Sequence, residues 1–190
     1  MLDLAQLGDI AGVHPLKEKQ APAELVEKVR GKRFDVAGFF LLENVERWHR
    51  WQSAGGLKSD RERWLFYGCP PAMSKEVLRP QRVAPYGSDV ARPFGPDALY
   101  LTDRAAPAAA IALRDYTVDE ALLISCRLAV GKAYRPQQMR PGAKAPPAGY
   151  DTIYARVGTD LGQGPLDHEL FVAYDADRVL LRFATHIVRR

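Results

Sequence analysis

Few side chains in this sequence have the types and spacing that acid–base, nucleophilic or metal chemistry requires. The four histidines show no metal-ligand spacing: His14, His49, His168 and His186. The pair His168-Glu169 could supply a general base, although such a pair at a loop edge is more often simply solvated. No strand-to-helix elbow motif marks the nucleophile of a Ser-His-Asp hydrolase. The sequence therefore predicts neither a metal centre nor a hydrolase of that type.

The two cysteines allow two interpretations of one thiol. Cys69 directly follows a glycine and could be reactive, but a small buried hydrophobic residue is the commoner role. Cys69 and Cys126 lie in separate segments without metal-like spacing, which favours a reduced, cytoplasmic setting. No signal peptide is recognisable, and no run of about 18 apolar residues predicts a membrane span.

Length and composition are those of an ordinary globular domain. The 190 residues fit one domain with a real core, and the chain is 47% hydrophobic and 26% charged. The net charge of +4 permits an anionic ligand such as a dinucleotide or RNA but does not indicate one. Composition leaves the oligomeric state open.

The hydrophobic periodicity predicts an α+β fold with a mixed, largely antiparallel sheet and short helices. The predicted strands cover residues 34–42, 63–67, 99–102, 121–130, 171–173 and 179–187. The predicted helices cover residues 22–29, 43–52, 74–78 and 105–113. Residues 1–20 show no clear period, and residues 79–97 and 135–149 are rich in proline and glycine and are expected to be loops.

The predicted helix at residues 43–52 has an apolar stripe. Val45, Trp48 and Trp51 are spaced three apart and would share one face, while Glu46 and Arg50 would pair across a turn. Tryptophans at this spacing are far more often core residues than a platform for stacking bases. We therefore expect both of them in the core.

Six short segments, in this order and spacing, resemble the catalytic domain of poly(ADP-ribose)-polymerase-type (PARP-type) ADP-ribosyltransferases. They are the strand at 34–42 leading into Arg47-Trp48, then Leu65-Phe66-Tyr67-Gly68, Leu99-Tyr100-Leu101-Thr102-Asp103, Leu122 to Gly131-Lys132, Gly149-Tyr150-Asp151-Thr152-Ile153 and Phe171 to Val179 with Tyr174-Asp175. The resemblance implies the fold of that family, with a split sheet. It also implies a transferase domain over residues 34–190, preceded by a lead-in and short helix over residues 1–33.

The resemblance implies that the substrate is NAD and that nicotinamide is released through an oxocarbenium-like transition state. The main chain of Gly68 would hold the carboxamide, because a glycine lets a ligand approach the backbone closely. Tyr100 would stack on the nicotinamide ring, the alternative being a tyrosine of a core strand. Tyr67 stands where the family has a histidine that bonds the adenosine ribose. It would either contact the dinucleotide or fill space.

Three other positions depart from the family pattern. Without a gap, Ala108 and Ile111 fall where the family has a serine on the carboxamide and a second stacking tyrosine. The family's catalytic glutamate aligns with Leu170, and Glu169 lies one residue early. Since side chains alternate along a strand, only a bulge would turn Glu169 to the same side as the aligned position. These changes weaken the polar contacts expected for nicotinamide and argue against polymer synthesis.

Three classes of function follow from these residues. The first is an NAD-dependent mono-ADP-ribosyltransferase acting on an unknown protein or nucleic-acid acceptor. The second is a catalytically inactive PARP-like domain that still binds NAD, ADP-ribose or a partner. The third is a module with a closed pocket whose loops bind RNA or protein.

Overall fold

The computed structural model describes residues 7–30, 34–56, 64–79, 93–114, 118–162 and 164–190. Its helices are α2 (Ala23–Val29), α3 (Val45–Ser53), α4 (Ser74–Leu78) and α5 (Ala105–Arg114). Its strands are β1 (Val13–Leu16), β2 (Phe34–Leu42), β3 (Leu65–Cys69), β4 (Leu99–Thr102), β5 (Glu120–Leu128), β6 (Ala133–Tyr134), β7 (Thr152–Ala155), β8 (Leu170–Ala173) and β9 (Val179–Arg189). Short 3-10 turns lie at Glu18–Gln20, Pro71–Met73 and Ala176–Arg178.

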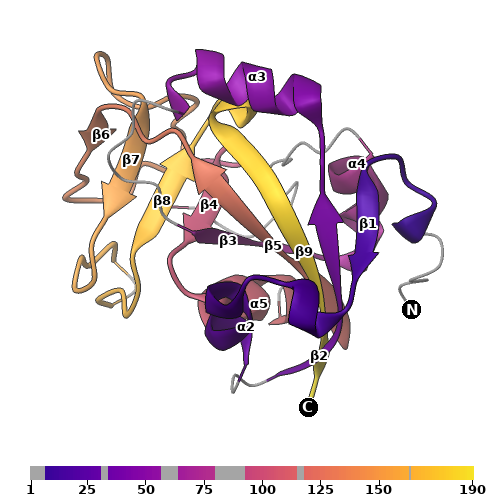
Figure 1. Ribbon diagram of the computed structural model, residues 1–190. Coiled ribbons are helices and arrows are strands. Elements are labelled where there is room, and N and C mark those ends of the chain that lie inside the picture. Colours follow the sequence, from indigo (N-terminus) through magenta and orange to yellow (C-terminus); the bar gives the residue numbers. More distant parts are fainter. Residues whose placement is uncertain (1–6, 31–33, 57–63, 80–92, 115–117, 163) are drawn as a thin grey trace.

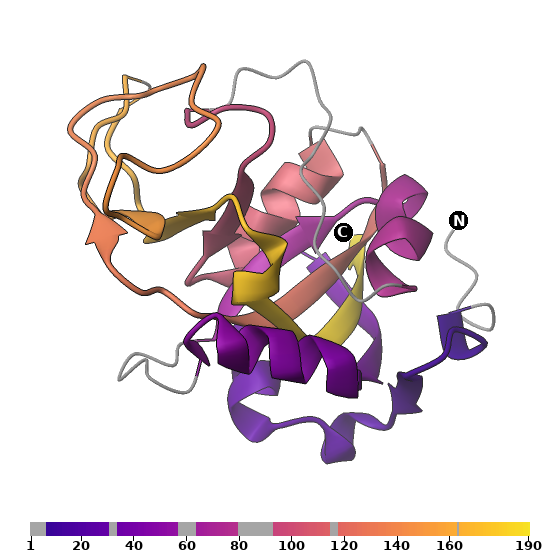
Figure 2. The same cartoon turned by 90° about the horizontal axis from the view of Figure 1, so that it is seen from above.

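The strands form one twisted sheet in the order β1-β2-β9-β5-β3-β4-β8-β7-β6 (Figure 1). All neighbouring pairs are antiparallel except β6 and β7, which are parallel. The long strands β2, β9 and β5 lie side by side. The short strands β6 to β8 and their loops lie on one side of the molecule, away from the N-terminal segment (Figure 2). The predicted α+β class with a largely antiparallel sheet is therefore confirmed.

The two halves of this sheet are joined weakly at its middle. Strand β3 pairs with β5 over its whole length, from Leu65 to Cys69. Toward β4, the described ladder contains the single pair Phe66–Thr102. The same register would place Gly68 opposite Tyr100, but the pairing does not extend to them. The predicted split sheet thus appears as one continuous sheet with a one-pair junction.

Alternation along the strands sends side chains to two faces. One face carries the largest core cluster, which includes Tyr67, Leu122 and Ile124 together with Val77 and Leu78 of α4. The other face is covered in one half by α2 and α5. In the other half it is covered by a separate cluster around Tyr100. The Gly68 region therefore lies where differently packed halves of the sheet meet.

Most predicted elements are present at or near their expected bounds, and three strands were missed. β1 lies in the stretch without a clear period and pairs with β2, from Val13–Leu42 to Leu16–Phe39. β6 and β7 have only two and four residues, too few for a period to show. Arg63, the start of one predicted strand, and residues 80–92 of the predicted loop at 79–97 lie outside the described residues.

The apolar stripe of α3 is only partly buried. Asn44 caps this helix by accepting a hydrogen bond from the Arg47 N–H at 3.0 Å, and the Glu46–Arg50 ion pair forms as expected. Trp51 is buried, but Trp48 is half-buried and Val45 is 73% exposed. The expectation that both tryptophans lie in the core is thus confirmed for Trp51 and only in part for Trp48, while Val45, the first residue of the helix, lines a surface pocket together with Trp48.

No helix in the parts of the chain listed above has both the length and the apolar character that a membrane crossing needs.

Candidate active site

Gly68 is in direct contact with helix α5. A Cβ atom at this position would lie 2.1 Å from the carbonyl oxygen of Ala108 and 3.0 Å from the Cβ of Ala112. Helix α5 can come this close because all but one of its buried residues, Leu113, are alanines: Ala105, Ala108, Ala109 and Ala112. The structure therefore brings together two predicted site residues, Gly68 and Ala108, that lie 40 residues apart in the sequence. At this contact only glycine fits.

Tyr100 is held by the loop that precedes its strand. Its hydroxyl accepts a hydrogen bond from the Phe94 N–H at 2.9 Å and donates one to the Gly95 carbonyl at 3.1 Å. The hydroxyl of Tyr174 donates to the Phe94 carbonyl at 2.6 Å, so both backbone polar groups of Phe94 are bonded by tyrosine hydroxyls. Partial burial raises the pKa of Tyr174 to about 12, so this donor stays protonated even in alkaline solution. Tyr100 itself is 5% exposed.

Leu170, rather than Glu169, lies on the Tyr100 face of the sheet. The β4–β8 ladder pairs Tyr100 with Val172 and Thr102 with Leu170 without a bulge, so Leu170 is a diagonal neighbour of Tyr100 and shares its cluster. Glu169 precedes β8 and accepts a hydrogen bond from the Tyr154 hydroxyl, while its N–H donates to Asp103 Oδ1 at 2.9 Å. In the structure, the side chain next to Tyr100 is therefore apolar.

Tyr67 and Ile111 pack away from Tyr100. Tyr67 is fully buried in the largest core cluster, and Ile111 packs against the same cluster. Cys69 follows on this strand, and burial, helped by the charge of Glu76, raises the pKa of its thiol well above the usual range. Cys69 is thus a protonated, buried side chain, which confirms its interpretation as a small hydrophobic residue.

Three of the segments that carry the resemblance meet at Asp151. One carboxylate oxygen accepts from the Lys132 N–H at 2.8 Å, and the other bonds the Arg178 guanidinium at 2.5 Å. Gly131 has a φ of +57°, and a Cβ there would lie 2.4 Å from Asp151 Oδ2. The glycine-lysine, glycine-tyrosine-aspartate and tyrosine-aspartate segments are therefore joined by one ion-paired carboxylate. This aspartate tethers the β5–β6 and β7 regions to the start of β9.

Six of the seven predicted site residues thus fall into three groups, and Glu169 belongs to none of them: Gly68 contacts Ala108, Tyr100 shares a cluster with Leu170, and Tyr67 belongs to the largest core cluster, against which Ile111 packs. Sequence reasoning missed Phe94, which bonds Tyr100, Tyr174, which bonds Phe94, and Tyr154, which bonds Glu169. The only sign of these contacts in the sequence was the phenylalanine next to a glycine in the predicted loop at residues 79–97, and it is a weak one. Among the residues that the structure describes, no three His, Cys, Asp or Glu side chains converge as a metal site would require.

A search of family models found none that matches this chain. A comparison with curated proteins also found no relative.

Proposed function

We propose that this chain is an NAD-dependent mono-ADP-ribosyltransferase with the PARP-type catalytic fold. The contact between Gly68 and Ala108 carries the proposal. The resemblance assigns both residues to the same carboxamide, and they are neighbours although they come from a strand and a distant helix. Pairing with β4 stops at Phe66, so this ladder does not occupy the edge of β3 at Gly68. A planar amide could therefore pair with the main chain there.

Each group at this site would have a separate role in the transfer. The main chain of Gly68 would hold the carboxamide, and the ring of Tyr100 would stack on nicotinamide. Cleavage of the nicotinamide–ribose bond leaves positive charge on the sugar, which a carboxylate normally stabilises. Since Leu170 occupies that place, the acceptor itself would supply the carboxylate or other nucleophile. Such a site transfers one ADP-ribose and does not build a polymer.

A second candidate is a domain that binds NAD or ADP-ribose without turning it over. The specific observation in its favour is the packing of the implied catalytic positions. Leu170 is apolar, Tyr67 is fully buried, and the hydroxyl of Tyr100 is bonded to the Phe94–Gly95 backbone. A pocket built this way keeps surfaces for stacking but few groups that stabilise developing charge.

Nicotinamide release separates the two candidates. The purified chain is incubated with NAD, and free nicotinamide is measured by chromatography with and without candidate protein or nucleic-acid acceptors. The transferase predicts release, and Tyr100→Ala should abolish it, whereas the control Tyr150→Ala, at an exposed tyrosine, should not. Turnover that survives Tyr100→Ala would refute the stacking role.

If no nicotinamide is released, thermal unfolding with NAD or ADP-ribose decides the second candidate. A ligand that binds only the folded state must raise the melting temperature, by an amount that grows with its concentration. A rise for NAD or ADP-ribose would support the binding domain. An unchanged melting temperature for both would contradict both candidates.

A further inference from the structure

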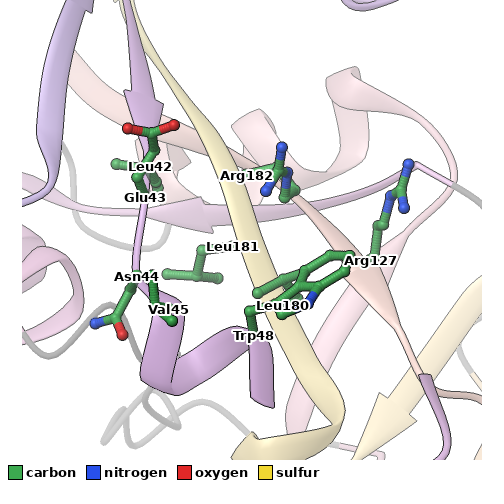
Figure 3. A pocket seen from close by; sticks show the side chains of 9 residues that line it. All are labelled: Leu42, Glu43, Asn44, Val45, Trp48, Arg127, Leu180, Leu181 and Arg182. Atoms are coloured by element: carbon green, nitrogen blue, oxygen red, sulfur yellow. The ribbon is translucent and has the colours of Figure 1, made fainter. Parts of the chain in front are cut away.

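A surface pocket next to α3 brings two arginines and a tryptophan together (Figure 3). It has a volume of about 340 Å³, within the usual range for small-ligand sites. Its lining residues come from the end of β2, the start of α3, and strands β5 and β9: Leu42, Glu43, Asn44, Val45, Trp48, Arg127, Leu180, Leu181 and Arg182. It shares none of these residues with the candidate active site.

A β-bulge places one of the arginines. The β5–β9 ladder pairs Ser125 with Phe183 and Cys126 with Leu181, so Arg182 is an extra residue on β9 without a partner in the register. Arg127 lies opposite Leu180 on the same ladder. Bulges turn a side chain out of the regular alternation and are frequent beside functional sites. Here the bulge puts Arg182 on the pocket wall near Arg127, as Figure 3 shows.

The positive charges of the two guanidinium groups repel each other. Partial burial lowers the pKa of Arg182, the charge of Arg127 lowers it further, and the carboxylate of Glu43 opposes the shift. Among the described residues, the Arg182 guanidinium makes no hydrogen bond or ion pair. The Arg127 guanidinium lies over the Trp64 ring, 5.6 Å from its centroid. A bound dianion would relieve this repulsion between like charges.

We infer that this pocket binds a nucleoside 5′-phosphate, with the phosphate at Arg127 and Arg182 and the base against Trp48. Paired guanidinium groups match the geometry of phosphate oxygens, because each can donate two parallel hydrogen bonds. The half-buried indole of Trp48 leaves part of its ring surface in the pocket, where a base can stack. This site is independent of the proposed transfer of ADP-ribose.

Glu43 favours a nucleotide over other aromatic phosphates. Its carboxylate lines the pocket and forms an ion pair with His14 at 3.5 Å, and a ligand gains there only if it brings a hydrogen-bond donor. The amino group of adenine and the ribose hydroxyls are such donors. The phenyl ring of phosphotyrosine has none. The same phosphate-and-base chemistry is found in a free mononucleotide and at the 5′ end of a nucleic-acid strand.

The test is calorimetric titration of the full chain with AMP, adenosine and inorganic phosphate. AMP should bind at least about tenfold more tightly than adenosine, because charged hydrogen bonds to the phosphate are lost in adenosine. Arg182→Gln and Arg127→Gln should each weaken AMP binding about tenfold, and Trp48→Leu about fivefold or more. Arg50→Gln, which removes an exposed arginine from α3 outside the pocket, should leave it unchanged.

Arg182→Lys keeps the charge and should bind AMP more tightly than Arg182→Gln, which excludes a mere folding defect. A 5′-phosphorylated oligonucleotide distinguishes the two sources: tighter binding than AMP indicates a strand end, and equal binding indicates a free nucleotide. The inference is overturned if millimolar AMP gives no binding heat or if phosphotyrosine binds better. It is equally overturned if AMP binds unchanged to both glutamine variants, which would place AMP elsewhere and leave the transferase proposal standing.

Discussion

The contact between Gly68 and Ala108 and the pocket at Arg127 and Arg182 are opposite kinds of region. The first lies in a segment that sequence motifs identify, and its main chain and helix backbone touch without room for a methyl group. The second has no sequence motif, yet it is open, charged and lined by an aromatic side chain. The difference shows that a motif can identify a scaffold, while exposed binding chemistry elsewhere arises from how strands pair.

The largest expected effect concerns the packed region. Gly68→Val should destabilise the fold by about 3 kcal/mol or more, because its Cβ would overlap the Ala108 carbonyl and α5 cannot retreat without opening the core. Gly142→Ala is the matched control, since a Cβ there meets nothing within 4 Å. Urea unfolding of both variants measures the difference. Equal stability of the two would mean that α5 does not press on β3.

A smaller loss of stability is expected when Tyr100 is changed. Tyr100→Phe keeps the ring but leaves the buried Phe94 N–H without its acceptor, which should cost about 1–3 kcal/mol. Tyr150→Phe alters an exposed tyrosine and should stay within about 0.5 kcal/mol of the parent. Thermal and urea unfolding compare the two variants. A Tyr100→Phe protein as stable as the parent would show that the loop at Phe94 does not depend on this hydroxyl.

In the pocket at Arg127 and Arg182, a substitution should leave the stability of the protein nearly unchanged. Arg182→Gln removes a cation that has no ion-pair partner among the described residues and that faces a second arginine. It should change stability by less than about 0.5 kcal/mol, or raise it. The same unfolding measurements apply, at low salt, where charge repulsion is least screened. A large destabilisation would reveal Arg182 as a structural residue and remove the contrast between the two regions.

Hydrophobic periodicity was sufficient to predict the long strands and helices but not the short strands. The run from Phe34 to Leu42 is long enough to show its type and bounds, and both are confirmed. β6 has two residues and owes its existence to pairing with β7, which no local pattern reveals. β1 was missed for the same reason, because its four residues include Pro15 and become a strand only beside β2.

For the candidate site, the sequence predicted which residues to examine but not how they are grouped. The ungapped alignment left both Leu170 and Glu169 as candidates, and the regular β4–β8 ladder is what puts Leu170 on the Tyr100 face of the sheet. The hydrogen bond from Tyr174 to Phe94, the residue that bonds Tyr100, spans 80 residues of chain and is beyond the reach of any spacing rule. The position of Arg182 depends on a bulge that only the pairing of two strands reveals.

The central claim is that the nicotinamide carboxamide binds the main chain of Gly68 at the edge of β3 that β4 leaves unpaired, and placing a serine at position 108 tests it most directly. Calorimetric titration with NAD should show that Ala108→Ser binds about 2- to 12-fold more tightly than the parent, the value of one hydrogen bond of about 0.5–1.5 kcal/mol. Ala110→Ser, at an exposed position of the same helix, should bind NAD like the parent. Equal affinities in all three proteins, or no NAD binding in any of them, would contradict the account.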